Sequence, residues 1–137
     1  MNRMEDLYPL MLEAFNNDLT FTFPINGTSM QPLLHTGDLV TIKKIDNRIK
    51  KGDIALFRRE NGAFVLHRVR RVNKDSYSFV GDHQYKLEKG IKDNQLIGLV
   101  ISYKKNNKEY HLNNFKYKLY KLLVRIGILR KVFGRIA

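Results

Sequence analysis

The sequence predicts a compact domain built mainly from antiparallel β-strands. Its 137 residues are 43% hydrophobic and 11% aromatic, which is enough apolar material for the core of one globular domain. Short runs of alternating apolar and polar residues follow one another closely, as is typical of strands. Gly-Asp and Asn-Gly pairs separate these runs, as expected for turns between antiparallel strands.

A short helix is expected first, over about residues 5–17. Leu7, Met11 and Phe15 recur there at helical spacing. Pro9 is compatible with this helix only if it lies in the first turn, because proline has no N–H to donate to the preceding turn.

Six strands are expected after this helix. Pro24 indicates that the first of them lies at an edge of the sheet. The sequence Glu60-Asn61-Gly62 predicts a hairpin between the third and the fourth. The expected strands are Leu19–Ile25, Leu39–Ile45, Asp53–Arg58, Phe64–Val72, Ser76–Val80 and Leu96–Tyr103.

The segment of residues 114–137 has a different character. Its apolar residues follow one helical face, and it contains seven basic residues and no acid, which is more than half of the net charge of +12. We therefore expect one folded domain over residues 1–113 and a basic amphipathic helix over 114–137. Such a helix can lie on an anionic membrane or dock on the β domain. Nucleic acid is the least favoured partner, since the segment shows no recognition motif.

The composition excludes several kinds of site. The chain has no cysteine, which excludes disulfides, thiolate metal sites and a cysteine nucleophile. Its histidines do not come with enough further ligands for a metal site, so neither a metal nor another cofactor is expected. No window has the length and hydrophobicity of a signal peptide or a transmembrane segment. We therefore expect a cytoplasmic protein, with peripheral membrane contact through residues 114–137 as an additional expectation.

The segment NGTSMQPLLHTGDLV, which begins at Asn26, contains the first candidate catalytic residue, Ser29. A serine hydroxyl is a weak nucleophile, and it requires a base and a group that orients this base. Gly27 allows the backbone to approach a substrate and leaves amides available for an oxyanion. The same pattern also fits an ordinary turn, so Ser29 alone does not define a site.

Two further segments supply the groups that a catalytic serine needs. His67 lies in the middle of an apolar strand and is followed by Arg68-Val69, and Asp82 follows a glycine just after a strand end. Taken singly, His67 fits a core histidine and Asp82 fits a turn cap. Together with Ser29, they supply the base and the carboxylate of a serine triad.

The order of these motifs resembles that of a known family. The motifs G-x-S-M-x-P-x-L-x-x-G-D, G-D-I-x-x-F, H-R-V and G-D follow one another over about residues 19–100. This set is similar to that of the serine peptidases of the signal peptidase I and LexA-type repressor group. The resemblance implies their coiled antiparallel β-sheet and the cleavage of peptide bonds in extended substrates. A histidine at position 67, in place of a lysine, resembles the archaeal and endoplasmic reticulum branch of signal peptidases.

The resemblance also implies a role for individual residues. Ser29 would be the nucleophile, His67 the base and Asp82 the carboxylate that orients it. Glu88 matches the position of a second acidic residue in the Ser-His branch, where it would be an accessory acid. The implied oxyanion- and substrate-binding residues are Ile25, Gly27, Thr28 and Met30.

The sequence thus predicts a serine-type endopeptidase that resembles signal peptidases. Its substrate would be an extended peptide or protein precursor, cleaved through Ser-His-Asp acyl-enzyme chemistry. One alternative is a catalytically silent module on the same fold that binds a membrane surface or nucleic acid. Another is a self-cleaving, repressor-like protein, but His67 argues against it because that class uses a lysine base.

Overall fold

The computed structural model describes residues 4–112. The expected helix over 114–137, and the division of the chain at residue 113, lie outside the described residues. Within them, one α-helix is followed by eight strands and a single 3₁₀ turn, η1 (Asp93–Gln95). The elements are α1 (Met4–Asn16), β1 (Phe21–Pro24), β2 (Leu39–Lys44), β3 (Ile54–Arg58), β4 (Phe64–Val72), β5 (Tyr77–Val80), β6 (Glu88–Ile91), β7 (Leu96–Lys105) and β8 (Lys108–His111).

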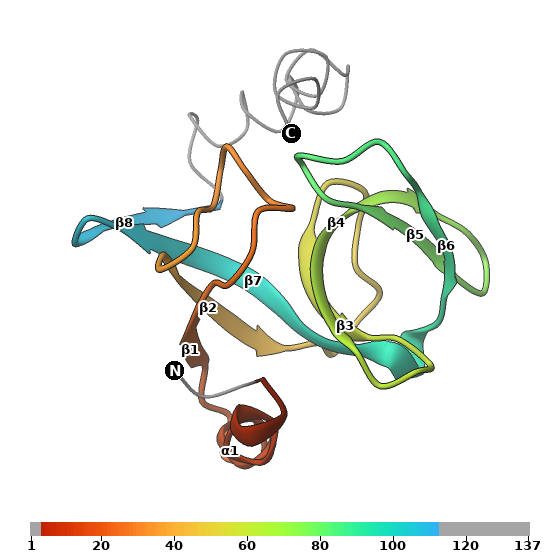
Figure 1. Cartoon of the computed structure of the whole chain (residues 1–137). Helices are drawn as coiled ribbons and strands as arrows, with labels where there is room; N and C mark the ends of the chain where they lie inside the picture. The colour runs from red at the N-terminus through yellow and green to blue at the C-terminus, as the bar shows by residue number, and fades with distance from the viewer. Residues whose placement is uncertain (1–3, 113–137) are drawn as a thin grey trace.

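The eight strands form one antiparallel sheet that curls on itself (Figure 1). Its strand order is β1-β2-β7-β3-β4-β5-β6, and β8 pairs with β7 outside this path. The long strand β7 joins the two parts of the sheet, because it pairs with β2 along most of its length and with β3 near its start. The expected mainly β, coiled antiparallel fold with a short N-terminal helix is therefore confirmed.

Strand β3 lies between two hydrophobic clusters. Successive side chains of a strand point to opposite faces of a sheet. Ile54 and Leu56 accordingly pack into one cluster with α1, β1 and β2, whereas Ala55 and Phe57 pack into the other with β4 and β5. This double burial explains why β3 is a continuous apolar run and does not alternate with polar residues.

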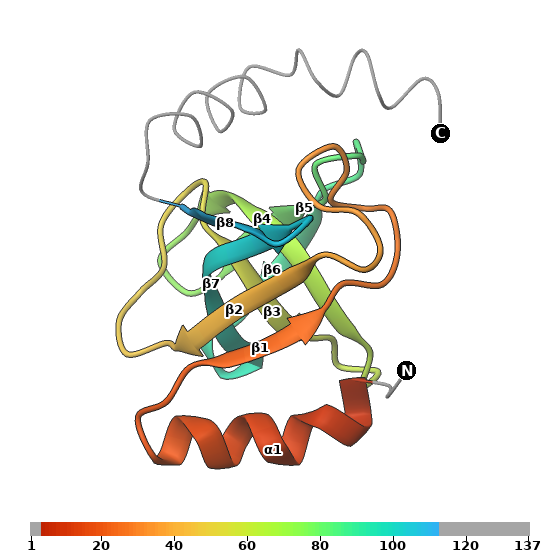
Figure 2. The same ribbon diagram turned by 90° about the vertical axis from the view of Figure 1, so that its left-hand side faces the viewer.

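Helix α1 runs along β1 at the edge of the sheet (Figure 2). Met11 and Phe15, one turn apart, are its buried residues and join the first cluster. Pro9 lies inside the helix as its sixth residue, so the expectation that it occupies the first turn is wrong. An internal proline costs about 3 kcal/mol, and the burial of the apolar face of α1 offsets this cost. No helix within residues 4–112 is long and apolar enough to cross a membrane.

The strands found by alternation agree with the structure to within one or two residues, but two strands were not expected. β6 contains a glycine and two charged residues, and β8 is almost entirely polar. Neither shows an apolar alternation of its own. Both form because a neighbouring strand, β5 or β7, offers an unpaired edge.

The packing of α1 leads to a stability prediction. Met11→Ala should lower the free energy of unfolding by about 2–5 kcal/mol, because Met11 is 0% exposed and truncation leaves a cavity. Leu10→Ala is the matched control. Leu10 is 55% exposed, so its truncation should change stability by less than about 0.5 kcal/mol. Urea denaturation of both variants measures the difference, and equal effects would contradict the packing of α1 on the sheet.

Candidate active site

Ser29 lies in the connection between β1 and β2, whose two ends are tied together. The amide of Ile25 donates to the carbonyl of Asp38 at 2.7 Å, and the amide of Gly37 donates to the carbonyl of Ile25 at 3.0 Å. The hydroxyl of Thr36 donates to the carbonyl of Gly27 at 3.1 Å. These bonds continue the pairing of β1 with β2 beyond the sheet. They therefore fix the conformation at both ends of the loop that carries Ser29.

The far side of this loop is anchored to β7. The ammonium of Lys105 donates to the carbonyl of Leu33 at 2.7 Å and pairs with the carboxylate of Asp38 at 3.2 Å. Asp38 also accepts from the amide of His35 at 2.8 Å. The aspartate of this first Gly-Asp pair thus closes the loop structurally.

A second loop, between β5 and β6, lies against the β1–β2 loop that carries Ser29 (Figures 1 and 2). The amide of His83 donates to the carbonyl of Ser29 at 2.8 Å. A Cβ atom at Gly81 would lie 2.5 Å from that same carbonyl oxygen, closer than real contacts allow. Gly81, the glycine of the third Gly-Asp pair, is therefore required by the close approach of the two loops.

Asp82, the next residue, forms a buried ion pair. The Nε of Arg68 donates to Oδ1 of Asp82 at 2.7 Å, and an Nη of Arg68 donates to Oδ2 at 2.8 Å. The other Nη of Arg68 donates to the carbonyl of Gly52 at 2.9 Å. Asp82 is 0% exposed. This two-bonded pair joins β4, the β2–β3 connection and the β5–β6 loop.

His67 occupies the middle of β4, beside the ring of Phe57, and is only 6% exposed. This burial, the largest influence, lowers the pKa of His67 to about 4. The charges of Glu88 and Asp82 act against this shift, and that of Arg59 adds to it. The imidazole is consequently neutral near pH 7, the state in which it can accept a proton.

Ser29 and His67 line the same pocket, which has a volume of about 260 Å³. A second pocket of about 510 Å³ adjoins it, since both include His67, Arg59 and Gln84 in their walls. The first pocket is also lined by three of the expected substrate-binding residues, Ile25, Gly27 and Met30. A serine, a neutral histidine and an open groove therefore meet at one place on the surface.

A comparison with protein families identifies the family of this domain. Residues 1–101 match the family model of Peptidase S24-like proteins. The chain belongs to the Peptidase S24-like family. Ser29, His67, Asp82 and Glu88 all lie within the matched residues. No curated protein matches the chain.

Membership of the Peptidase S24-like family supports a serine peptidase-like fold and the serine peptidase class for this protein. It agrees with the resemblance to the LexA and signal peptidase I group found in the sequence. The family match does not distinguish the Ser-His branch from the lysine-dependent one. The identity of the base therefore rests on His67 and its position in the groove.

The structure separates Asp82 from the expected contact with His67. Nδ1 of His67 has no hydrogen-bond partner among residues 4–112, whereas both carboxylate oxygens of Asp82 accept from Arg68. The expected Asp82–Nδ1 hydrogen bond is therefore not formed. Thr28 is exposed beside the site but does not line the groove described above. In this Peptidase S24-like protein, the third Gly-Asp pair, Gly81-Asp82, contacts the serine loop and makes no hydrogen bond to Nδ1 of His67.

Two residues of the groove could not be expected from the motifs. Arg59 directly follows β3, where the turn to β4 begins. Its guanidinium donates twice to Glu88, from Nε at 2.9 Å and from Nη at 2.9 Å. Gln84 follows the Gly-Asp pair and lines both pockets. The predicted hairpin turn was the only sequence signal next to Arg59, and it did not indicate the direction of the side chain. Glu88, the expected accessory acid, lines the second pocket together with His67.

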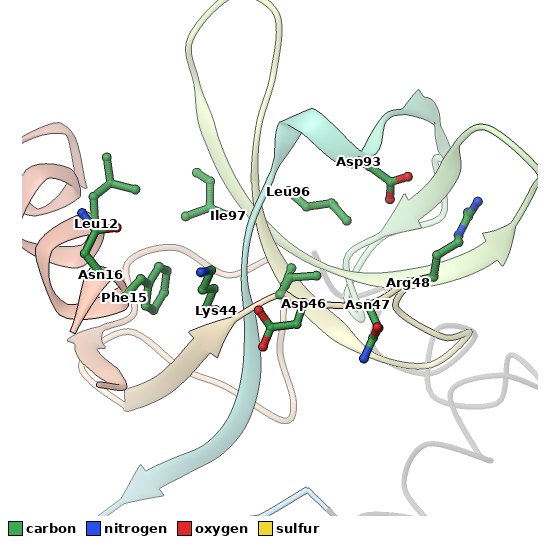
Figure 3. Close-up of a pocket in the computed structure, with 11 residues that line it drawn as sticks. Leu12, Phe15, Asn16, Lys44, Asp46, Asn47, Arg48, Asp93, Leu96 and Ile97 are labelled. Carbon is green, nitrogen blue, oxygen red and sulfur yellow. The ribbon is translucent and has the colours of Figure 1, made fainter. Parts of the chain in front are cut away.

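A larger pocket, of about 620 Å³, lies elsewhere, between the end of α1 and the connection from β2 to β3 (Figure 3). Two of the charged residues that line it already have partners within the chain. Arg48 donates to the carbonyls of Asn73 and Lys74, and Asp93 accepts from the hydroxyl of Tyr77 at 2.8 Å. Among residues 4–112 no group of three or more His, Asp or Glu side chains could hold a metal ion. The Ser29–His67 groove remains the candidate active site.

The buried ion pair can be tested by mutation. Asp82→Asn should destabilise the fold by about 3–5 kcal/mol, because it leaves the buried Arg68 guanidinium without a counter-charge. Asp75→Asn, at an exposed position in the β4–β5 turn, should change stability by less than about 0.5 kcal/mol. Thermal and urea unfolding report both values. A small effect of Asp82→Asn would show that the pair is not needed for folding.

His67 also leads to a prediction about pH. The pKa of His67 is about 4 in the folded protein, against an ordinary value of 6.5. Between these two pH values, the unfolded chain therefore binds a proton that the folded chain does not. Stability should therefore fall as the pH falls from 7 to 4. The wild type should lose about 3 kcal/mol more over this range than His67→Gln, which cannot titrate. Urea denaturation at each pH tests this, with the exposed His111→Gln as a control that behaves like the wild type.

Proposed function

We propose that this protein is a serine endopeptidase in which Ser29 is the nucleophile and His67 is the base. The observation that carries the proposal is their shared position in one open groove, with His67 held neutral by burial. A buried, neutral histidine beside a loop serine is the pairing that activates a hydroxyl. The Ser-His branch of the signal peptidase-like group combines the same two residues.

The proposed reaction proceeds through an acyl-enzyme. His67 takes the proton from the hydroxyl of Ser29 as the oxygen attacks the carbonyl carbon of the scissile peptide bond. The resulting imidazolium returns this proton to the departing amine, the C–N bond breaks and an ester to Ser29 remains. Water, deprotonated by His67, then hydrolyses the ester and restores the hydroxyl.

The developing oxyanion requires N–H donors beside Ser29. The amide of Gly27 already donates to the hydroxyl of Thr36 at 3.2 Å, so the donors are better sought at Ser29 itself and at Thr28. The bond from His83 to the carbonyl of Ser29 holds this stretch of backbone in place. A donor of this kind commonly contributes about 3 kcal/mol to transition-state stabilisation.

An extended peptide fits the walls of the groove. The segment 25–27, which continues the edge strand β1, and the segment 64–66 of β4 both line the pocket. Because Ile25 directs its backbone bonds towards residues 37 and 38, the next backbone groups along the chain face the other way, towards the pocket. We propose that the substrate adds there as a further strand.

The proposed role of Asp82 is structural. It holds the β5–β6 loop against Ser29 through Arg68, and it influences His67 only through its charge. The substrates we propose are peptide or protein precursors, as in signal-peptide processing. Peripheral membrane contact through residues 114–137 lies outside the described residues and stays a prediction.

Labelling with a serine-directed phosphonate tests the proposal directly. Intact mass should show one adduct on the wild type and none on Ser29→Ala. His67→Ala should lower the labelling rate at least 100-fold, because general-base assistance commonly contributes about 10²–10⁴-fold.

Ser78→Ala is a matched control. Ser78 is a buried serine of β5 that lines neither pocket of the groove, so its variant should still be labelled. Circular dichroism shows that each variant is folded. A folded wild type without an adduct would reject the peptidase and favour a catalytically silent module on the same fold.

A further inference from the structure

Arg59 lines three neighbouring pockets. Its amide donates to the carbonyl of Ala63 at 2.8 Å, and its carbonyl accepts from the amide of Gly62 at 2.9 Å, so the β3–β4 hairpin fixes its backbone. Its side chain is 40% exposed and lines the pocket of Ser29, the adjoining pocket of Glu88 and a third pocket beyond them. A substrate in the groove therefore meets this guanidinium.

The guanidinium of Arg59 donates two hydrogen bonds to Glu88, the only acidic residue among residues 4–112 that lines the two pockets containing His67. Glu88 favours the protonated form of His67, and Arg59 opposes it. Asp82 is the other charged group that acts on this ring, and Arg68 already neutralises it. The balance between Arg59 and Glu88 therefore controls the charge around His67.

The ring of His67 has one unused position. Its Nδ1 is buried and has no hydrogen-bond partner among residues 4–112. A serine peptidase works best when a carboxylate orients the base and stabilises its imidazolium form. Glu88 shares a pocket with His67, but its oxygens are held by Arg59. One pocket is thus lined by an acid that is bound to a cation and by a histidine whose Nδ1 has no partner among residues 4–112.

We propose that Arg59 is a substrate-responsive positioning residue for His67. An acidic group of the peptide substrate, bound by Arg59, draws the guanidinium from Glu88 and leaves this carboxylate to orient His67. The inference rests on the proposed Ser29–His67 chemistry and adds to it a substrate class, peptides with an acidic side chain close to the scissile bond. Carboxylates suit this role because a guanidinium binds them in the same two-bonded geometry that it now makes with Glu88.

The position of the acidic group follows from the groove. Arg59 lines the same pocket as the segment 25–27, along which we propose that the substrate pairs. We therefore place the acidic residue on the acyl side of the scissile bond. Lys86, in the wall of the adjoining pocket, adds a second positive charge to this region. Both charges favour an acidic peptide over a neutral or a basic one.

The test uses two peptidyl diphenyl phosphonates that differ only in carrying Glu or Gln, placed in turn at each of the three positions before the phosphorus. The rate of Ser29 labelling is measured from about pH 3 to pH 8 on the full chain, a range that includes the pKa of His67. The wild type should react about tenfold faster with the Glu probe. The midpoint of its acidic limb should lie about one pH unit higher with Glu than with Gln, since bound substrate releases Glu88.

Arg59→Gln should raise the midpoint for the Gln probe to that of the Glu probe and abolish the preference between them. Glu88→Gln should lower the midpoint, and in this background Arg59→Gln should have little further effect. Arg71→Gln is the matched control, because it makes the same change at an exposed residue of β4 that lines neither pocket. It should behave like the wild type with both probes.

The outcomes separate the two proposals. Equal rates with the Glu and Gln probes at every position, on a wild type that is labelled at Ser29, would overturn the role of Arg59 and leave the Ser29–His67 chemistry intact. A shifted midpoint in Arg59→Gln without any preference for Glu in the wild type would overturn it too, because Arg59 would then act only as a fixed charge. No labelling of the folded wild type by any of the probes would overturn the proposed function, and this inference with it.

Discussion

The buried pair of Arg68 and Asp82 organises the functional half of the molecule. Isolated charges are costly inside a protein, so each of these two side chains requires the other and cannot relax separately. Their bonds reach three segments that are distant in sequence, namely β4, the turn at Gly52 and the β5–β6 loop. The pair therefore converts a flexible connection into a rigid support for the serine loop.

The same constraint determines how Ser29 and His67 are brought together. Neighbouring residues of a strand point to opposite faces, so Arg68 reaches inwards to the loops while His67 faces the groove. The loop that Arg68 anchors then presents the amide of His83 to Ser29. The positions of Ser29 and His67 thus both depend on one stretch of β4, and Asp82 makes no hydrogen bond to Nδ1 of His67.

Much of the fold could be predicted because local patterns determine it. Strands such as β4, with a half-buried face, show an alternation that the sequence reveals to within a residue or two. β6 and β8 could not be found in this way, because their polar residues become strands only when a neighbour offers an edge. Pro9 was misplaced for a related reason, since tertiary packing of α1 outweighs the local cost of a proline.

For the candidate site, the sequence indicated which residues to examine, but it did not indicate the contacts that they make. The order of the motifs predicted that Ser29 and His67 belong to one site, and in the structure both residues line one pocket. It could not show whether Asp82 pairs with His67 or with the adjacent Arg68, because the two lie one position apart and only the strand's orientation distinguishes them. Arg59 was missed because its importance depends on a partner 29 residues away, and no local pattern links the two.

The contact between Gly81 and Ser29 bears on how activity is lost among proteins of this fold. No side chain fits at this glycine without displacing the backbone of Ser29. A relative could therefore keep its serine and histidine and still be inert, through a change at a position that never meets the substrate. For sorting active members from inactive ones, the residue before this aspartate is as informative as the serine itself.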